Sequence, residues 1–316
     1  MQDAIIIGGG AAGLSAALQL GRSRRTVTVV DAGQPRNAPS PHAHGFLTRD
    51  GVAPLELPRL GRADLEPYDV RVLDGTVVSA GKVDGVFHVA LADGTTIEAP
   101  RLLVTTGVVD ELPAIPGLAE RWGQDLVHCP YCHGWEIRDQ AIGVIGSSTM
   151  AVHQALLFRQ WSPNITLFLN SAPEPAAAER RQMAARGVRL VEGAVARIHS
   201  TDGAVSGVEL ADGSLHRVEA LTAQSRVVAR AGFLTTLGLA PEAGEFGELL
   251  QVDGNGLTAI PGVWAAGNVT DMRATVLAAA YAGAMAGVAI NMDMIAAELA
   301  ADMAAFDAAE PALARG

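Results

Sequence analysis

Two cysteines and two histidines stand together in the stretch HCPYCH, residues 128–133, and these side chains are the best suited to chemistry in the chain. Cys129 and Cys132 are the only cysteines among 316 residues. Two intervening residues allow a small disulfide ring that can open and close, and a thiolate at a helix start has a lowered pKa that makes it the attacking group. The same letters also match the C-x-x-C-H signature of c-type haem attachment and part of a zinc site.

Neither a haem nor a zinc site fits the rest of the chain. Haem attachment follows export, whereas the opening residues, MQDAIIIGGG, have no cationic segment and an apolar run too short for a signal peptide. Zinc needs four ligands, and Cys129, Cys132 and one flanking histidine supply three at best. In a reducing cytosol a lone C-x-x-C is more often catalytic than structural. We therefore expect a redox-active disulfide, no metal, and a cytoplasmic protein.

His133 directly follows the second cysteine, and an imidazole at that position can transfer protons near neutral pH. Cys129, Cys132 and His133 are thus the predicted catalytic residues. His128 can act in the same way, or it can be a capping or surface histidine without a catalytic role.

Composition excludes several other classes of function. The net charge is −11, and the chain has no basic run with interleaved aromatic residues, which argues against nucleic acid as a partner. No stretch of about 18 uncharged apolar residues predicts a membrane span. The Ala-rich segment 276–297 comes nearest, but Asn291 and Asp293 interrupt it, so it is interpreted as a buried helix.

The N-terminal sequence, DAIIIGGGAAGLSAALQLGRS, predicts a strand, a glycine turn and a helix, followed by a second strand in TVTVVDAG. Gly8, Gly10 and Gly13 allow a tight turn and the close approach of a pyrophosphate to the helix, while Asp31 ends the second strand and can bind a ribose. In this context the G-x-G-x-x-G motif predicts a dinucleotide-binding unit.

The rest of the chain repeats this plan. Alternating runs in residues 70–104 and the turn ADGTT predict a β-meander with a hairpin, and LPAIPG at 112–117 marks a domain boundary. A second strand, glycine turn, helix and strand follow in QAIGVIGSSTMAVHQALLFRQ and NITLFLN. A second hairpin lies in GAVSGVELADGSLHRVEAL, and a long helical region begins near residue 274.

This order resembles the low-molecular-weight, thioredoxin reductase-like branch of the flavoprotein disulfide oxidoreductases. The resemblance rests on GGGAAG, on LLVTTG at 102–107, on the C-x-x-C after the linker, and on IPGVWAAGNVTD near the end. It implies an α/β fold with two Rossmann-like dinucleotide-binding domains, each of three ββα layers. The FAD-binding domain would be discontinuous, with residues 1–112 and 242–316, and residues 113–241 would form an NAD(P)H-binding-like domain carrying the redox pair.

The resemblance also implies FAD as cofactor and a homodimer. Cys129 would exchange with the substrate and Cys132 would face the flavin. In the family an Asp usually follows the second cysteine, where this chain has His133, and Gly267-Asn268 replaces a Gly-Asp pair. The predicted cofactor-binding residues are Gly8, Gly10, Gly13, Asp31, Asn37, His44, Gly107, Gly267 and Asn268.

The second glycine motif departs from the NADPH-dependent pattern. Ser148 stands where a glycine would let the pyrophosphate approach, and the next strand ends in Leu169-Asn170-Ser171 instead of the His-Arg-Arg cluster that holds a 2′-phosphate. Arg180 and Arg181 come about ten residues later. The sequence therefore predicts that NADPH is not used.

The chain is similar to the dithiol oxidases of gliotoxin and holomycin biosynthesis. The similarity rests on this altered motif, on CPYCHGW and on the loop RNAPSPHAHGFLTRDG at 36–51. The resemblance implies oxidation of a dithiol to a disulfide with oxygen as acceptor. A thioredoxin reductase-like enzyme fed by NADPH or by a protein donor such as ferredoxin, and a non-catalytic flavin and disulfide redox sensor, remain alternatives. The substrate can be a small dithiol or a thioredoxin-like protein.

Overall fold

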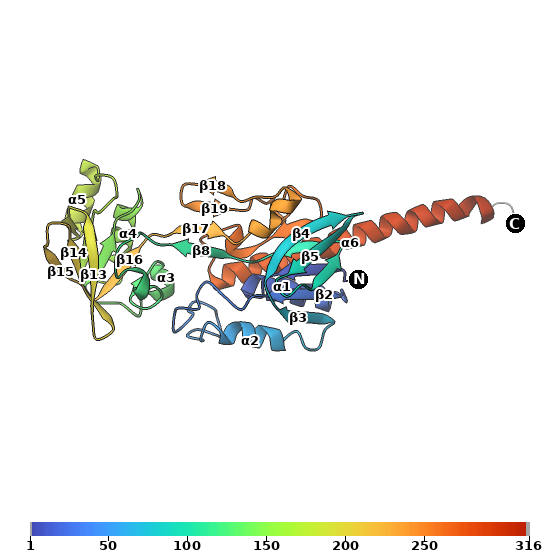
Figure 1. Ribbon diagram of the computed structural model, residues 1–316, viewed down its shortest axis with the longest axis horizontal. Coiled ribbons are helices and arrows are strands. Elements are labelled where there is room, and N and C mark those ends of the chain that lie inside the picture. Colours follow the sequence, from blue (N-terminus) through green and yellow to red (C-terminus); the bar gives the residue numbers. More distant parts are fainter. Residues whose placement is uncertain (1, 314–316) are drawn as a thin grey trace.

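The computed structural model describes residues 2–313 and contains two similar units joined by a narrow connecting sheet (Figure 1). Each unit has a five-stranded parallel sheet with helices on one face and a three-stranded antiparallel meander on the other. The expected pair of three-layer ββα Rossmann-like units is confirmed.

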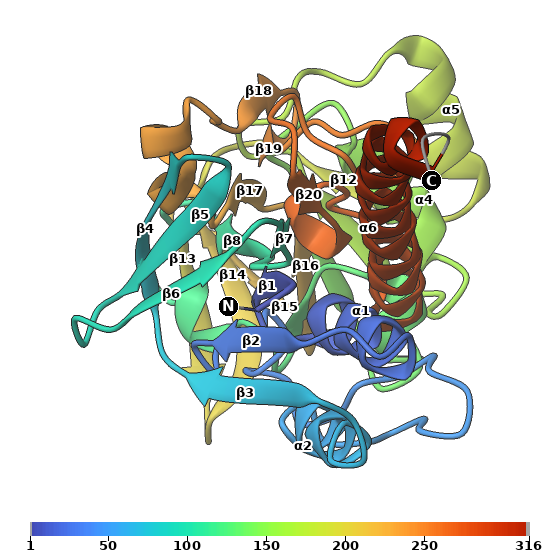
Figure 2. The same cartoon turned by 90° about the vertical axis from the view of Figure 1, so that its right-hand side faces the viewer.

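The first unit has the strand order β20-β7-β1-β2-β3. Its strands are β1 (Ala4–Ile7), β2 (Val27–Asp31), β3 (Val70–Asp74), β7 (Leu102–Val104) and β20 (Val263–Ala265). Helices α1 (Ala11–Arg22) and α6 (Val276–Leu313) cover one face, and β4 (Val77–Val83), β5 (Val86–Leu91) and β6 (Thr96–Ala99) cover the other, as Figure 2 shows. Helix α2 (Glu56–Ala63) packs on α1. The strands are continuous apolar runs because both faces of the sheet are buried.

The middle unit repeats the arrangement with the order β12-β11-β10-β16-β9. Its strands are β9 (Leu126–Val127), β10 (Ile142–Ile145), β11 (Ile165–Phe168), β12 (Arg189–Val191) and β16 (Ala220–Ala223). Helices α4 (Ala151–Phe158) and α5 (Ala177–Ala185) lie on one side, and the meander β13 (Val195–Thr201), β14 (Ala204–Leu210) and β15 (Leu215–Arg217) lies on the other. Both predicted hairpins and the repeated strand–turn–helix–strand unit are present.

A four-stranded sheet connects the two units. The chain leaves the first unit on β8 (Val108–Glu111) and returns on β17 (Arg226–Ala229), which pairs antiparallel with β8. The hairpin of β18 (Glu242–Gly244) and β19 (Gly247–Leu249) extends this sheet, and short 3-10 turns lie at η1 (Ala119–Arg121), η2 (Gly232–Leu237) and η3 (Gly267–Val269). Ala231 and Leu234 already belong to the core of the first unit. The chain therefore re-enters the first unit near residue 226, whereas the sequence predicted that the second part of the FAD-binding domain begins at residue 242.

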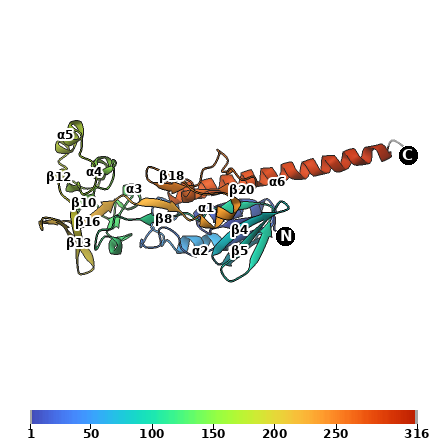
Figure 3. The same ribbon diagram turned by 45° about the horizontal axis from the view of Figure 1, so that its top comes forward.

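Helix α6 differs from the expected buried helix. Its first half packs against α1, where a Cβ on Gly283 would lie 1.9 Å from the carbonyl oxygen of Ala12, so only glycine permits this approach. Its second half extends beyond the sheet, as Figure 3 shows. By length and composition alone α6 could cross a membrane, and only 22% of its most apolar 18-residue window is buried. The expectation of a buried helix is wrong, because only one side of α6 has a partner within the described chain.

Candidate functional site

A cavity of about 1140 Å³ lies where the first unit meets the redox segment of the middle unit. It exceeds the roughly 300–1,000 Å³ of ordinary small-molecule sites. The three predicted catalytic residues and all but one of the predicted cofactor-binding residues line it: Gly8, Gly10, Asp31, Asn37, His44, Gly107, Cys129, Cys132, His133, Gly267 and Asn268. The exception is Gly13.

The first glycine turn forms an open cradle at the N-terminus of α1. Gly8 has φ +113° and a Cβ there would lie 2.4 Å from the carbonyl oxygen of Thr105. Gly13 lies behind the turn, where a Cβ would be 1.9 Å from the carbonyl oxygen of Gly8. At Gly10 the space is open, and a side chain there would project into it. The cradle thus fits a pyrophosphate against the free N–H groups of α1.

Asp31 lies at the end of β2 and is already held by protein groups. Its carboxylate accepts a hydrogen bond from Arg62 at 2.6 Å and one from the backbone N–H of Gly33 at 3.1 Å. Arg62 comes from α2, where no sequence pattern had marked it. It orients the carboxylate that is expected to meet the ribose.

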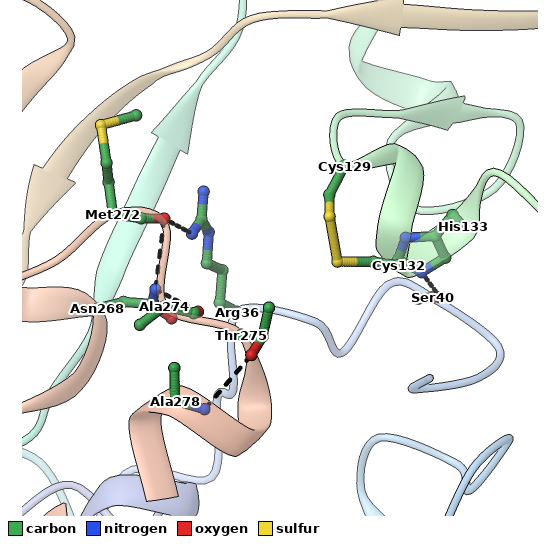
Figure 4. Close-up of a disulfide and its surroundings, with 10 residues drawn as sticks. All are labelled: Arg36, Ser40, Cys129, Cys132, His133, Asn268, Met272, Ala274, Thr275 and Ala278. Carbon is green, nitrogen blue, oxygen red and sulfur yellow. Dashed lines mark hydrogen bonds between the residues drawn. A yellow bond between two sulfur atoms is a disulfide. The ribbon is translucent and has the colours of Figure 1, made fainter. Parts of the chain in front are cut away.

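Asn268 stabilises a turn beside the cavity (Figure 4). Its amide nitrogen donates to the carbonyl oxygen of Ala274 at 2.9 Å and to that of Asp271 at 3.1 Å. The hydroxyl of Thr275 accepts from the backbone N–H of Ala278 at 3.3 Å at the start of α6. The amide nitrogen of Asn268 therefore holds the protein chain that borders the cofactor cavity.

The redox segment contains a disulfide between Cys129 and Cys132, with a Cα–Cα distance of 5.3 Å. Cys129 precedes the single helical turn α3 (Pro130–His133), which begins with a proline at a position where its missing N–H costs nothing. The predicted disulfide pairing is confirmed. Among residues 2–313 no cluster of three or more His, Cys, Asp and Glu side chains is placed to hold a metal ion.

His133 lies beside Cys132, and its Nε2 is 2.9 Å from the hydroxyl oxygen of Ser40, a residue of the first unit (Figure 4). Burial lowers the pKa of His133; the negative charge of Glu136 works against this effect and the nearby His44 adds to it. The imidazole is consequently neutral at pH 7 and can accept a proton.

His128 forms part of the cavity wall on the other side of the disulfide. Burial, together with the positive charge of Arg36, lowers the pKa of His128 to about 4, against the opposing effect of Asp110. Its ring meets Trp122 edge to face, with centroids 6.3 Å apart. His128 is therefore uncharged at neutral pH.

An ion pair between Arg36 and Asp110 lies next to His128 and joins the first unit to the connecting strand β8. Two hydrogen bonds of 2.7 and 2.6 Å link the two side chains, and Ser225 donates to the same carboxylate at 2.6 Å. Burial raises the pKa of Asp110, but the hydrogen bond and charge of Arg36 outweigh it and hold this pKa below its usual range. Arg36 also donates to the carbonyl oxygen of Met272 at 3.1 Å.

His44 bridges the loop after β2 and the redox segment. Its Nδ1 lies 3.4 Å from Asp50, and its Nε2 lies 3.4 Å from Glu136, directly after the CPYCHGW motif. His42 is bonded through Nδ1 to the carbonyl oxygen of Gly51 at 3.1 Å. Both histidines line the cavity.

The second glycine turn, between β10 and α4, makes hydrogen bonds to side chains from other segments. Ser148 donates to the side-chain oxygen of Gln224, and Thr149 donates to Glu245 at 3.1 Å. Asn170, at the end of β11, donates to the carbonyl oxygen of Gly146 at 3.1 Å.

The first arginine after the end of β11 is paired with two glutamates. Arg180 forms ion pairs with Glu174 and with Glu192. No signal in the sequence marked Gln224, Glu245 or these ion pairs, because each contact joins residues that are separated along the chain.

Comparison with known proteins agrees with this geometry. A family model described as pyridine nucleotide-disulphide oxidoreductase matches residues 2–287. The thioredoxin reductase tcpT of Claviceps purpurea is 35% identical over 308 residues, which cover 93% of this chain and 94% of that protein. The crystal structure of HlmI is 44% identical with a TM-score of 0.88 and 96% of each chain covered. An oxidoreductase from Agrobacterium tumefaciens is 40% identical with a TM-score of 0.88, over 93% of this chain and 98% of that one.

Proposed function

Since the chain belongs to the pyridine nucleotide-disulphide oxidoreductase family, as a thioredoxin reductase-like flavoprotein disulfide oxidoreductase, we propose that it oxidises a dithiol to a disulfide without NADPH. The observation that carries this proposal is the set of side-chain contacts at the second glycine turn, where Ser148 bonds Gln224 and Thr149 bonds Glu245. Electrons then enter from the substrate thiols through Cys129 and Cys132, and oxygen is the acceptor.

FAD is the cofactor that the first unit fits. Gly8 and Gly10 would border its pyrophosphate, Asp31 its ribose, and Asn37, Gly107 and Gly267 the rest of the cavity wall, with His44 at the redox end. Bound there, FAD would supply a two-electron acceptor for the reduced cysteine pair and a donor to oxygen, with hydrogen peroxide as the product.

The cysteines perform the exchange with the substrate. A substrate thiolate attacks the sulfur of Cys129, the Cys129–Cys132 bond breaks, and Cys132 leaves as a thiolate with the bonding electron pair. The second substrate thiol loses its proton, attacks the substrate sulfur of the mixed disulfide and releases Cys129 as a thiolate. The substrate has then lost two electrons and two protons, and the cysteine pair holds the electrons.

The contacts around the second glycine turn support independence from NADPH. The carboxylate of Glu245 bonds Thr149 beside the position of a nucleotide pyrophosphate, so two negative groups would meet there. Asn170 provides no acid for ribose hydroxyls, and the ion pairs of Arg180 keep its guanidinium from a 2′-phosphate.

Two exposed aromatic side chains lie beside the disulfide. Tyr131 and Trp135, within the redox segment itself, are exposed by 74% and 67%. They offer an apolar surface to either candidate substrate, a small dithiol or a thioredoxin-like protein. We further propose a cytoplasmic location and a homodimer formed through α6.

Anaerobic flavin absorbance of the purified holoprotein tests the proposed function. Dithiothreitol alone should bleach the flavin, admission of air should restore it with release of hydrogen peroxide, and NADPH or NADH should have no effect within minutes. The variant Cys132→Ser should not bleach, since its cysteine pair cannot pass electrons on. Rapid bleaching by NADPH would overturn the proposal and assign a reductase.

A further inference from the structure

Ser40 contributes to the redox centre from the opposite unit. It lies in the loop between β2 and α2, its residue is only 6% exposed, and its side chain reaches His133 in the middle unit (Figure 4). The hydroxyl oxygen is 2.9 Å from Nε2 of His133 and also 2.9 Å from the backbone carbonyl oxygen of His42.

These two contacts determine which nitrogen of His133 carries the proton. A serine hydroxyl has one hydrogen to donate, and a carbonyl oxygen can only accept. The hydroxyl hydrogen therefore bonds the carbonyl of His42, and the hydroxyl oxygen accepts from Nε2–H of His133. In the neutral imidazole the other nitrogen, Nδ1, then has the free lone pair.

We propose that Ser40 is a positioning residue for thiol–disulfide exchange, which holds His133 in the Nε2–H tautomer so that Nδ1 acts as the base for substrate thiols. This inference rests on the proposed function, because it assigns the proton acceptor of the same site. The hydroxyl of Ser40 acts through its bonds to His133 and to the backbone of His42.

The proton and electron balance of the step is complete. The thiol hydrogen of the substrate moves to Nδ1, the resulting thiolate bonds to the sulfur of Cys129, and Cys132 departs with the electron pair of the broken disulfide. Nδ1 then returns the proton to solvent before the second thiol reacts, so each turnover passes two protons through His133.

The groups facing His133 are consistent with this role. Glu136 and His44 lie near the ring, with Asp50 on the far side of His44. The backbone of His42, which accepts from Ser40, also hydrogen-bonds His133 and raises its pKa. Burial, the strongest influence on its pKa, keeps the imidazole neutral at pH 7, so that the tautomer decides whether a base is available.

The test combines a rate with a direct observation of the tautomer. In ¹⁵N-histidine-labelled oxidised holoprotein, the signals absent from His133→Gln should show a protonated Nε2 and an unprotonated Nδ1. Ser40→Ala should mix the tautomers and slow anaerobic bleaching by dithiothreitol roughly three- to tenfold, the effect of losing one neutral hydrogen bond. Ser40→Thr, which keeps the hydroxyl, should restore both the tautomer and most of the rate.

A matched control separates chemistry from folding. Thr258→Val removes an equally buried hydroxyl that donates to the carbonyl oxygen of Val263 at 2.9 Å, outside the cavity lining. It should lower the melting temperature without slowing bleaching. A wild-type Nδ1–H, or a Ser40→Ala variant with unchanged tautomer and rate, would overturn the proposal. If dithiothreitol fails to bleach the wild type, the dithiol oxidation fails instead, and the tautomer is still measured.

Discussion

At the scale of single residues, the two histidines beside the disulfide show how burial keeps an imidazole neutral. Both have pKa values lowered mainly by burial, and each lies beside groups from a distant part of the chain: Ser40 next to His133, and Arg36 with Asp110 next to His128. The sequence predicted Cys129, Cys132 and His133 as catalytic residues, because the types and spacing of neighbouring residues are visible in a linear pattern; of this prediction the disulfide pairing is confirmed. It missed Ser40, which is 93 positions from its partner.

The lowered pKa of His128 predicts a pH dependence of stability. The unfolded state takes up a proton at the ordinary histidine pKa of about 6.5, whereas the folded state does so only near pH 4. Between these values the unfolded state binds more protons, so the free energy of unfolding should fall as pH drops from 6.5 to 4, by at most about 3 kcal/mol from this residue. Urea unfolding at pH 7, 5.5 and 4 measures the loss.

The variant His128→Gln isolates this contribution, since glutamine does not titrate. Its free energy of unfolding should decline less steeply with acid than that of the wild type. If the free energy of unfolding fell equally with acid in both proteins, the pH dependence would not come from His128.

At the scale of elements, the connecting strands β8 and β17 are fixed to the first unit by the Arg36–Asp110 ion pair. The side chain of Asp110 is only 5% exposed. Removing the partner of a buried carboxylate costs far more than removing one partner of an exposed pair. Arg36→Met should therefore lower the free energy of unfolding by about 3 kcal/mol.

The exposed pair of Arg59 and Glu56 on α2 provides the comparison. Arg59→Met should cost less than about 1 kcal/mol in the same urea titration. If both variants lowered the free energy of unfolding equally, the Arg36–Asp110 pair would contribute no more to stability than an exposed pair. Because Arg36 also lowers the pKa of His128, the Arg36→Met variant should have a higher histidine pKa, which NMR can follow.

The elements themselves were largely predictable. The strand–turn–helix units and both hairpins follow local rules of alternation, glycine turns and helix length. The return of the chain near residue 226 was not predictable, because short strands such as β17 carry no signal of the sheet they join. The contacts of Ser148 with Gln224 and Thr149 with Glu245 likewise depend on how the units meet.

At the scale of the whole molecule, helix α6 carries an exposed apolar stripe. Its members follow one another at intervals of three or four residues, the spacing that brings one side of a helix against a second helix: Leu277, Tyr281, Met285, Val288, Met292, Ile295, Leu299, Met303 and Phe306. Composition alone suggested a buried helix, since it cannot tell burial within one chain from burial between two. We infer that a second copy of this chain covers the stripe.

A charge placed within the stripe tests this inference. Leu299→Glu should convert a dimer to a monomer in analytical ultracentrifugation, because a carboxylate would be buried without a partner. Ala301→Glu, an exposed position two residues further along and off the stripe, should leave the mass unchanged. A monomeric wild type at micromolar concentration would rule out the second copy as the occupant.

The hairpin of β18 and β19 couples two contacts at the second glycine turn. Glu245 reaches from the connecting sheet to that turn, where it accepts a hydrogen bond from Thr149. Under the proposed function, Ser148→Gly alone would leave this carboxylate beside the turn, and Glu245→Gln alone would leave Ser148 bonded to Gln224. Engineering a nucleotide site here would therefore require both changes in one variant.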